Sequence, residues 1–233
     1  HGLKPIIGCE VYVAPESRHD KKEKYDLRDA SYHLILLAQN EKGYKNLLKL
    51  VTFGYMEGFY YKPRIDKELL AEYAEGLIAL SSCGRGEIAH NINKENIPRA
   101  IKMAGQYRDI MGQDNFFLEL QNHKMEYQEK INNELVKIGD KLSLPLVATN
   151  NCHYLDREDF HAHEILLCLQ TGKTMSDQYR MRYPSDEYYF KSPEEMAELF
   201  RDIPQAIENT LKIAERCELE IDFDKLNFPD YPV

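Results

Sequence analysis

The alternation of short apolar runs with longer amphipathic segments is the feature that most limits how this chain can fold. Apolar runs of strand type occur at 4–14, 32–39, 76–83, 115–121 and 144–150. Between them, apolar residues recur every three or four positions, as in helices that bury one face, at 43–58, 66–74, 97–112 and 126–142. Nearly continuous apolar strands are typical of a sheet covered on both faces. The pattern therefore predicts an α/β fold with parallel strands covered by helices.

The character of the chain changes after residue 160. A helical segment at 160–173 is followed by a tyrosine-rich loop and by a predicted pair of helices within 192–217. Ser192 suits a helix N-cap, Pro193 suits the first turn and Glu195 completes a capping box. We expect the second helix of the pair to end near Cys217. The acidic, aromatic and proline-bearing tail at 222–233 indicates an exit toward another domain.

The length and composition of the chain limit which class of protein it can belong to. A chain of 233 residues can form one large domain with a sizeable core. No run approaches the roughly 18 apolar residues of a membrane span, so no membrane role is expected. The first residues lack a signal-peptide pattern and an initiator Met, so we expect the chain to begin inside a longer protein.

Charge and cysteine usage narrow the class further. A net charge of −9 argues against a surface that binds nucleic acid mainly through phosphate charge. The 5 cysteines are widely spaced and form no C-x-x-C pair. This usage indicates a reduced, cytoplasmic protein and no disulfide framework.

Side chains that can bind metals stand near the ends of four predicted strands. They are Glu10, His33, Cys83 and the pair Asn151 and His153. In α/β folds chemistry collects at the carboxyl ends of strands. Asn151 and His153 are two apart and would share one side of a strand, with Cys152 facing the other way. Each residue alone also has an ordinary explanation as a solvated Glu, a core His or a buried Cys. Their joint placement favours a metal site without deciding it.

Other candidates carry weaker signals. His161 and His163 are two positions apart in a predicted helix and do not share a face. The stretch 169–174 echoes a phosphate-binding loop, but Leu167 stands where its first Gly is required. Glu119 either points into a cleft or pairs with a base. The aromatic and basic segment 58–67 either contacts phosphates or a partner, or packs as an exposed turn.

A family resemblance is carried by "KPIIGCEVYVAP", "EGFYYKPRIDKELL", "LPLVATNNCHYLDRED" and "LLCLQTGKT". In these stretches the chain closely resembles the polymerase and histidinol phosphatase (PHP) domain of bacterial replicative DNA polymerase III alpha subunits. The resemblance implies a distorted (βα)7 barrel with up to three divalent metal ions at the carboxyl ends of its strands. It also implies that residues 1–233 are a single PHP domain, truncated at its N-terminus, and that 222–233 lead toward the polymerase palm.

The resemblance assigns ligand positions residue by residue. By motif, Glu10, His33, Cys83 and His153 take family ligand positions, while Asn151 stands where the family usually has Asp. The family's H-x-H and Asp-His motifs precede the segment that matches residue 4 onward, so we expect an incomplete barrel whose first strands are missing. An Asn keeps an oxygen but lacks the negative charge that hard cations prefer. We expect one zinc or manganese ion or none here, with Mg²⁺ in the parent polymerase domain.

The resemblance also implies a function in DNA replication, within a cytoplasmic DNA-directed DNA polymerase. The implied partners are other alpha-subunit domains, the proofreading exonuclease subunit, replisome components and, through the parent protein, primer–template DNA. We expect a structural and docking role with residual metal binding, and leave open whether the fragment is itself an enzyme. The alternative is a metal-dependent 3′–5′ exonuclease or phosphoesterase active in the full-length protein. A nucleic-acid-binding module is a third possibility, and the charge of −9 opposes it. Open sheet edges would also make the isolated chain marginally stable.

Overall fold

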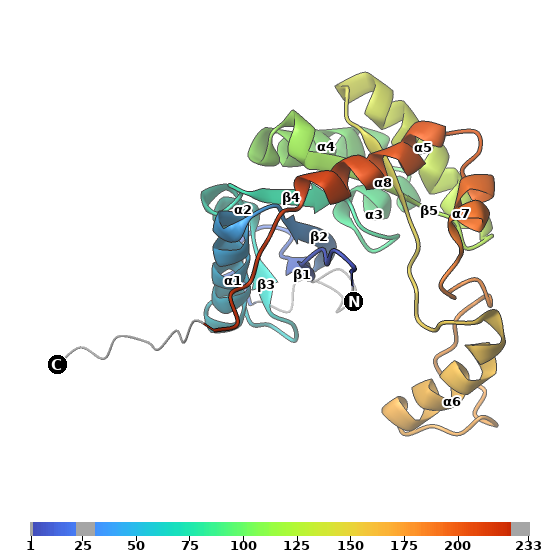
Figure 1. Ribbon diagram of the computed structural model, residues 1–233. Coiled ribbons are helices and arrows are strands. Elements are labelled where there is room, and N and C mark those ends of the chain that lie inside the picture. The colour runs from blue at the N-terminus through green and yellow to red at the C-terminus, as the bar shows by residue number, and fades with distance from the viewer. Residues whose placement is uncertain (1, 22–30, 225–233) are drawn as a thin grey trace.

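One mixed sheet organises the computed structural model, which describes residues 2–21 and 31–224 (Figure 1). The six strands lie in the order β3-β1-β2-β4-β5-β6. Their bounds are β1 Gly8–Val13, β2 Tyr32–Ala38, β3 Arg64–Ile65, β4 Leu77–Leu80, β5 Phe116–Gln121 and β6 Leu146–Thr149. The sheet is not closed, because β3 and β6 are its two outer strands. The expected exit segment at 222–233 falls largely outside the described residues.

Strand direction departs from the predicted pattern at one place. β1 pairs in parallel with β3, as do β4 with β5 and β5 with β6. β2 is antiparallel to both of its neighbours, β1 and β4. Antiparallel neighbours need no crossover helix, and the described parts of the chain between β1 and β2 contain none. The α/β class is confirmed, with a mixed and mostly parallel sheet.

Eight α-helices are present in the described ranges. They are α1 Glu41–Met56, α2 Lys67–Glu72, α3 Glu87–Asn93, α4 Ile97–Met111, α5 Glu126–Leu142, α6 Phe160–Thr171, α7 Pro193–Leu199 and α8 Pro204–Arg216. The predicted capping box exists, because the Glu195 amide donates to Ser192 Oγ at 3.2 Å and the Ser192 amide donates to Glu195 Oε2 at 2.8 Å. Helix α8 ends next to Cys217, as expected. No described helix has the length and apolar character needed to cross a membrane.

The central strands are covered on both faces, which explains their continuous apolar sequences. Leu77 and Ala79 of β4 belong to the large core formed with the helices that follow the strands, whereas Ile78 and Leu80 belong to a second cluster beneath α8. On β2, the partly buried Ile35 and Leu37 pack against the same cluster and therefore lie on the side of the sheet that faces α8. His33 lies two residues before Ile35 and therefore shares that side of the sheet.

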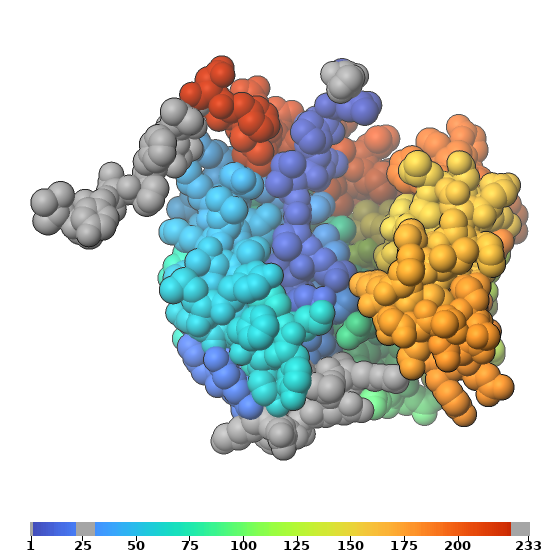
Figure 2. Space-filling model, turned by 90° about the horizontal axis from the view of Figure 1, so that it is seen from below, coloured from blue at the N-terminus to red at the C-terminus, as the bar shows by residue number. Residues whose placement is uncertain are grey.

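Helix α6 lies apart from the sheet, and the chain comes back from it to α7 (Figure 1). We call residues 172–192 the return segment. From below, α6 and the return segment (yellow to orange) stand beside the N-terminal part of the chain (blue) (Figure 2). The candidate site lies where the return segment rejoins the rest of the protein.

Candidate functional site

All five residues proposed as metal ligands line one pocket of about 480 Å³. Glu10 comes from β1, His33 from β2, Cys83 from the turn after β4, and Asn151 and His153 from the chain after β6. The antiparallel direction of β2 explains the place of His33, since the start of that strand lies at the same sheet edge as the carboxyl ends of its neighbours. Residues of the return segment also line the pocket, among them Arg182, Tyr183 and Tyr188.

Glu10 and His33 form the closest pair in this pocket. Glu10 is paired in register with Ile35, so Glu10 and His33 are diagonal neighbours on one face of the β1–β2 ladder. Glu10 Oε1 lies 3.0 Å from His33 Nδ1. The His33 side chain is only 9% exposed, and its ring also interacts with the Cys83 thiol.

The charges of this pair are linked to Cys83. Burial lowers the pKa of His33, but the neighbouring Cys83 and Glu10 outweigh burial and raise that pKa to about 9. The hydrogen bond with His33 lowers the pKa of Glu10 against the effect of burial. Burial raises the pKa of Cys83, yet His33 and nearby hydrogen bonds reverse the direction and lower it. The three groups therefore favour a cation on His33 beside the Glu10 carboxylate.

A tight turn after β4 brings Cys83 to this pair. Ser82 has a φ of +66°, in the left-handed region that non-glycine residues seldom adopt. At Gly86 an added Cβ would lie 2.1 Å from the Ser81 carbonyl oxygen, so the turn leaves no room for a side chain there. The His33 amide donates to the Arg85 carbonyl at 3.1 Å, which fixes the turn against the start of β2.

The predicted strand geometry for Asn151 and His153 is wrong, because β6 ends at Thr149. Both residues nevertheless line the pocket, and contacts with the return segment explain why. The His153 amide donates to the Tyr188 carbonyl at 2.8 Å, and Asn150 Nδ2 donates to the Tyr189 carbonyl at 2.7 Å. The Cys152 thiol lies near that Tyr189 carbonyl, at 3.8 Å, and does not line the pocket.

Aromatic side chains surround His153. The Tyr183 hydroxyl lies 2.9 Å from His153 Nε2, and the two ring centroids are 4.5 Å apart. The ring of His163 lies 5.5 Å from that of His153. Burial and the neighbouring His163 lower the pKa of His153. The spacing of residues within α6 did not identify His163 as part of the site, because the side chains that surround His163 come from other parts of the chain.

The donor types in the pocket suit a metal ion, but their arrangement does not surround one. A thiol, an imidazole and a carboxylate are donors that zinc accepts. Within residues 2–21 and 31–224, no group of three or more His, Cys, Asp or Glu side chains is placed to hold a metal ion. Glu10 and His33 contact each other, and His153 contacts Tyr183. Metal binding at these residues remains a prediction.

Glu119 points into a small cavity that it shares with Cys83 and Gln121. Its Oε1 accepts hydrogen bonds from Gln121 Nε2 at 2.9 Å and from the Thr149 hydroxyl. Its Oε2 has no hydrogen-bond partner among the described residues. Burial raises the pKa of this carboxyl group. Of the two interpretations offered by the sequence, the cleft fits Glu119 and the pairing with a base does not.

The segment 58–67 combines exposed aromatics with a structural arginine. Phe59 and Tyr61 are exposed, but Arg64 is buried. The Arg64 guanidinium donates to the carbonyls of Gly58 at 3.1 Å and Asp20 at 2.8 Å. Arg64 therefore holds neighbouring loops together and is not available for phosphate.

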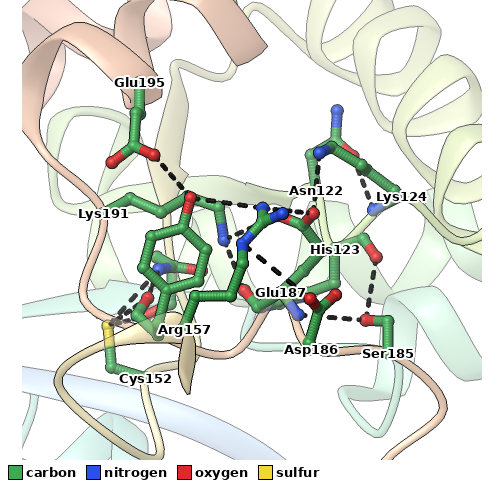
Figure 3. A network of polar contacts seen from close by, with 12 residues as sticks. Asn122, His123, Lys124, Cys152, Arg157, Ser185, Asp186, Glu187, Lys191 and Glu195 are labelled. Atoms are coloured by element: carbon green, nitrogen blue, oxygen red, sulfur yellow. Dashed lines mark hydrogen bonds and ion pairs between the residues drawn. The ribbon is translucent and has the colours of Figure 1, made fainter. Parts of the chain in front are cut away.

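A network of charges attaches the return segment beside the pocket (Figure 3). Its centre is Glu187, whose side chain is 4% exposed. Glu187 Oε1 lies 2.6 Å from Arg157 Nη2 and 2.7 Å from Lys124 Nζ, and Oε2 lies 3.3 Å from Lys191 Nζ. The Tyr189 hydroxyl donates to Glu195 at 2.5 Å. The return segment is thereby fixed to the chain after β5, to the turn before α6 and to α7.

Comparison with known proteins agrees with the resemblance. The PHP domain family matches residues 1–123. The chain is 48% identical to DNA polymerase III subunit alpha of Borreliella burgdorferi, over 100% of this chain and 20% of that protein. It is 47% identical to the protein of the same name from Treponema pallidum, over 94% of this chain and 19% of the relative. For the Thermus aquaticus protein of that name, the identity is 43% over 100% of this chain and 19% of the relative.

The chain thus spans about a fifth of the length of these relatives. The family match covers more than half of the chain, and the relatives match nearly all of it. The chain belongs to the PHP domain family.

Proposed function

We propose that this chain is the PHP portion of a replicative DNA polymerase III alpha subunit and that its role there is mainly structural. Residues 1–233 would belong to a single PHP domain whose C-terminal end leads to the polymerase palm. It would support the other polymerase domains and provide a docking surface for the proofreading exonuclease subunit and replisome components. Primer–template DNA and Mg²⁺ would be bound by the parent protein, in the cytoplasm.

The arrangement of the pocket is the observation that carries this proposal. The five candidate ligands line one pocket, yet among the described residues no three His, Cys, Asp or Glu side chains are placed to hold one ion. Asn151 is neutral where the family's usual residue is charged. The missing charge at residue 151 disfavours a hydrolytic centre with several hard metal ions.

Residual binding of a single ion remains part of the proposal. Glu10, His33 and Cys83 would hold it once their side chains had turned toward a common point, because a carboxylate and a thiol stand beside the His33 ring. This donor set suits zinc, with manganese as the harder alternative. When bound, the ion would link the ends of three strands and so add to the stability of the domain.

The full-length alpha subunit provides the test. We expect elemental analysis after dialysis to find no more than one zinc or manganese ion per PHP domain, and we expect no metal-dependent trimming of DNA 3′ ends. A His153→Ala variant should retain polymerase activity, as should the exposed control His161→Ala. Three tightly bound ions, with 3′-end trimming that His153→Ala abolishes, would contradict the structural role.

A metal-dependent 3′–5′ exonuclease or phosphoesterase is the second candidate. Arg85 and Arg182 also line the pocket, and guanidinium groups bind phosphate oxygens well. The same trimming assay separates the two functions. Only the second candidate predicts that Arg85→Ala and Arg182→Ala lower a measurable rate of 3′-end hydrolysis.

A further inference from the structure

Helix α6 carries an exposed stripe of apolar side chains. Ala162, Ile165, Leu166 and Leu169 recur at helical spacing, so they lie along one side of the helix, and we call them the α6 stripe. All four are exposed, Leu166 at 61% and Leu169 at 73%. A single exposed Leu is ordinary, but apolar residues that adjoin one another at the surface mark an interaction site.

Side chains outside the stripe attach α6 to the return segment. Leu167 and Cys168 are buried, and Cys168 Sγ lies 3.7 Å from Met175 Sδ. Glu164 is the only Asp, Glu, Lys or Arg in α6, and it pairs with Arg180 at 2.8 Å. These two side chains are 12% and 7% exposed. The one charge of α6 is therefore turned inward, and the exposed surface of the helix carries none.

The stripe is held at a fixed place on the protein, although α6 stands apart from the sheet (Figure 1). Where the chain leaves for α6 and comes back, the Phe190 amide donates to the Leu155 carbonyl at 3.1 Å. Close by, Glu187 pairs with Arg157 at 2.6 Å. Leu155 and Phe190 are themselves large exposed apolar residues. A surface fixed in advance loses little entropy when a partner binds to it.

The absence of charge on the stripe indicates what kind of partner fits it. Charged residues are depleted in the buried cores of interfaces, and permanent interfaces are more apolar than transient ones. Nucleic acid is bound largely through cations, and the stripe has none. The partner should therefore be a protein segment with an apolar surface of its own that stays bound.

A partner of this kind is available within the longer relatives. The matched region makes up 19–20% of three relatives, so about four fifths of each lies outside it. A segment of the same polypeptide is present at an effective concentration of the order of millimolar, which suits permanent cover. We propose that the α6 stripe docks onto an apolar segment of the parent alpha subunit that lies outside residues 1–233. This inference rests on the proposed function, in which the chain is part of such a subunit.

Hydroxyl-radical footprinting of the full-length protein, followed by mass spectrometry, tests the proposal without any substitution. In the protein alone, we expect Leu166 and Leu169 to be oxidised about tenfold more slowly than in the urea-unfolded protein, as a docked surface requires. Leu166→Lys should remove most of this protection at Leu169. Leu211→Lys is the matched control, because Leu211 is 66% exposed on α8, and it should leave Leu169 protected. Leu169→Gln, read at Leu166, replaces Leu166→Lys if that variant fails to fold.

Three results would overturn the inference. Oxidation of Leu166 and Leu169 at the rate of the unfolded protein would show that nothing covers the stripe. Protection that appears only at concentrations where the protein dimerises would make a second copy the partner. Protection that appears only after the exonuclease subunit is added would assign the stripe to that subunit. The proposed function fails on a different observation, three tight ions with 3′-end trimming, so the two failures can be told apart.

Discussion

The imidazole ring of His123 lies flat against the phenol ring of Tyr188, with centroids 4.2 Å apart and ring planes 10° apart. His123 is completely buried, and Gln128 Nε2 lies 2.8 Å from its Nδ1. An amide NH₂ can only donate, so Nδ1 acts as the acceptor of a neutral ring. Burial is the main reason that the pKa of His123 falls to about 4.

The lowered pKa of His123 predicts that the protein loses stability in mild acid. An unfolded His has a pKa near 6.5, so the unfolded chain takes up a proton before folded His123 does as the pH falls. The contribution of neutral His123 to the free energy of unfolding is complete above about pH 6.5 and declines toward pH 4. Between pH 7.5 and 5 the free energy of unfolding should fall by roughly 2 kcal/mol through this group. Urea unfolding of the parent and His123→Gln should show a shallower pH dependence in the variant.

The exposed His161 supplies the control for this prediction. His161→Gln should retain the pH dependence of the parent protein. An unchanged pH dependence in His123→Gln would mean that another group is responsible.

Replacing two helical glycines by alanine should change the free energy of unfolding in opposite directions. In α1, a Cβ on Gly43 would lie 1.8 Å from the Gly76 carbonyl oxygen, so backbone would have to move. We expect Gly43→Ala to lower the free energy of unfolding by about 3 kcal/mol or more. In α4, a Cβ on Gly105 meets no atom within 4 Å, and Gly105→Ala should stabilise by about 0.5–1 kcal/mol. Thermal melts of both variants test the pair, and a destabilised Gly105→Ala would contradict it.

Two leucines of α1 provide a matched test of core packing. Leu50 is 0% exposed and Leu48 is 49% exposed. Leu50→Ala should reduce the free energy of unfolding by about 2–5 kcal/mol, because it removes contacts and leaves a cavity. Leu48→Ala should change it by less than about 1 kcal/mol. Similar losses in chemical denaturation of the two variants would show that α1 is oriented differently.

The buried carboxylate of Glu187 should matter more than any surface pair. Glu187→Gln would leave Lys191, whose side chain is 2% exposed, without its charged partner. We expect a loss of about 3 kcal/mol or more in the free energy of unfolding. Glu198→Gln is the control, since Glu198 pairs with Arg201 at the surface and should contribute about 0–1 kcal/mol. Equal effects of both substitutions would show that the Glu187 network is solvated.

Local sequence patterns predicted where helices and strands form better than they predicted the direction in which the strands run. Apolar periodicity located the longer strands and helices, because burial of one or both faces leaves a repeating signature. It missed β3, whose 2 residues are too few for a repeat to appear, and it also missed α3. It also could not show that β2 runs against its neighbours, because a strand buried on both faces reads the same in either direction.

The residues of the candidate site likewise divide into those that the sequence predicted and those that it did not. Glu10, His33 and Cys83 stand on or beside strands, so strand-end reasoning and the family motifs both pointed to them. Tyr183 and His163 owe their positions to contacts between segments twenty or more residues apart, such as the Tyr183–His163 ring contact. No spacing within either segment encodes such a contact, and only the folded chain reveals it.

His153 and Tyr183 lie near the two ends of one excursion, residues 150–192, which leaves the sheet through α6 and comes back to it. The entropy of closing such a loop grows only slowly with its length. Insertions or deletions around α6 should therefore be tolerated by the rest of the domain during evolution. Each would change how the ring of Tyr183 meets the ring of His153, while the strands that carry Glu10 and His33 stay unchanged.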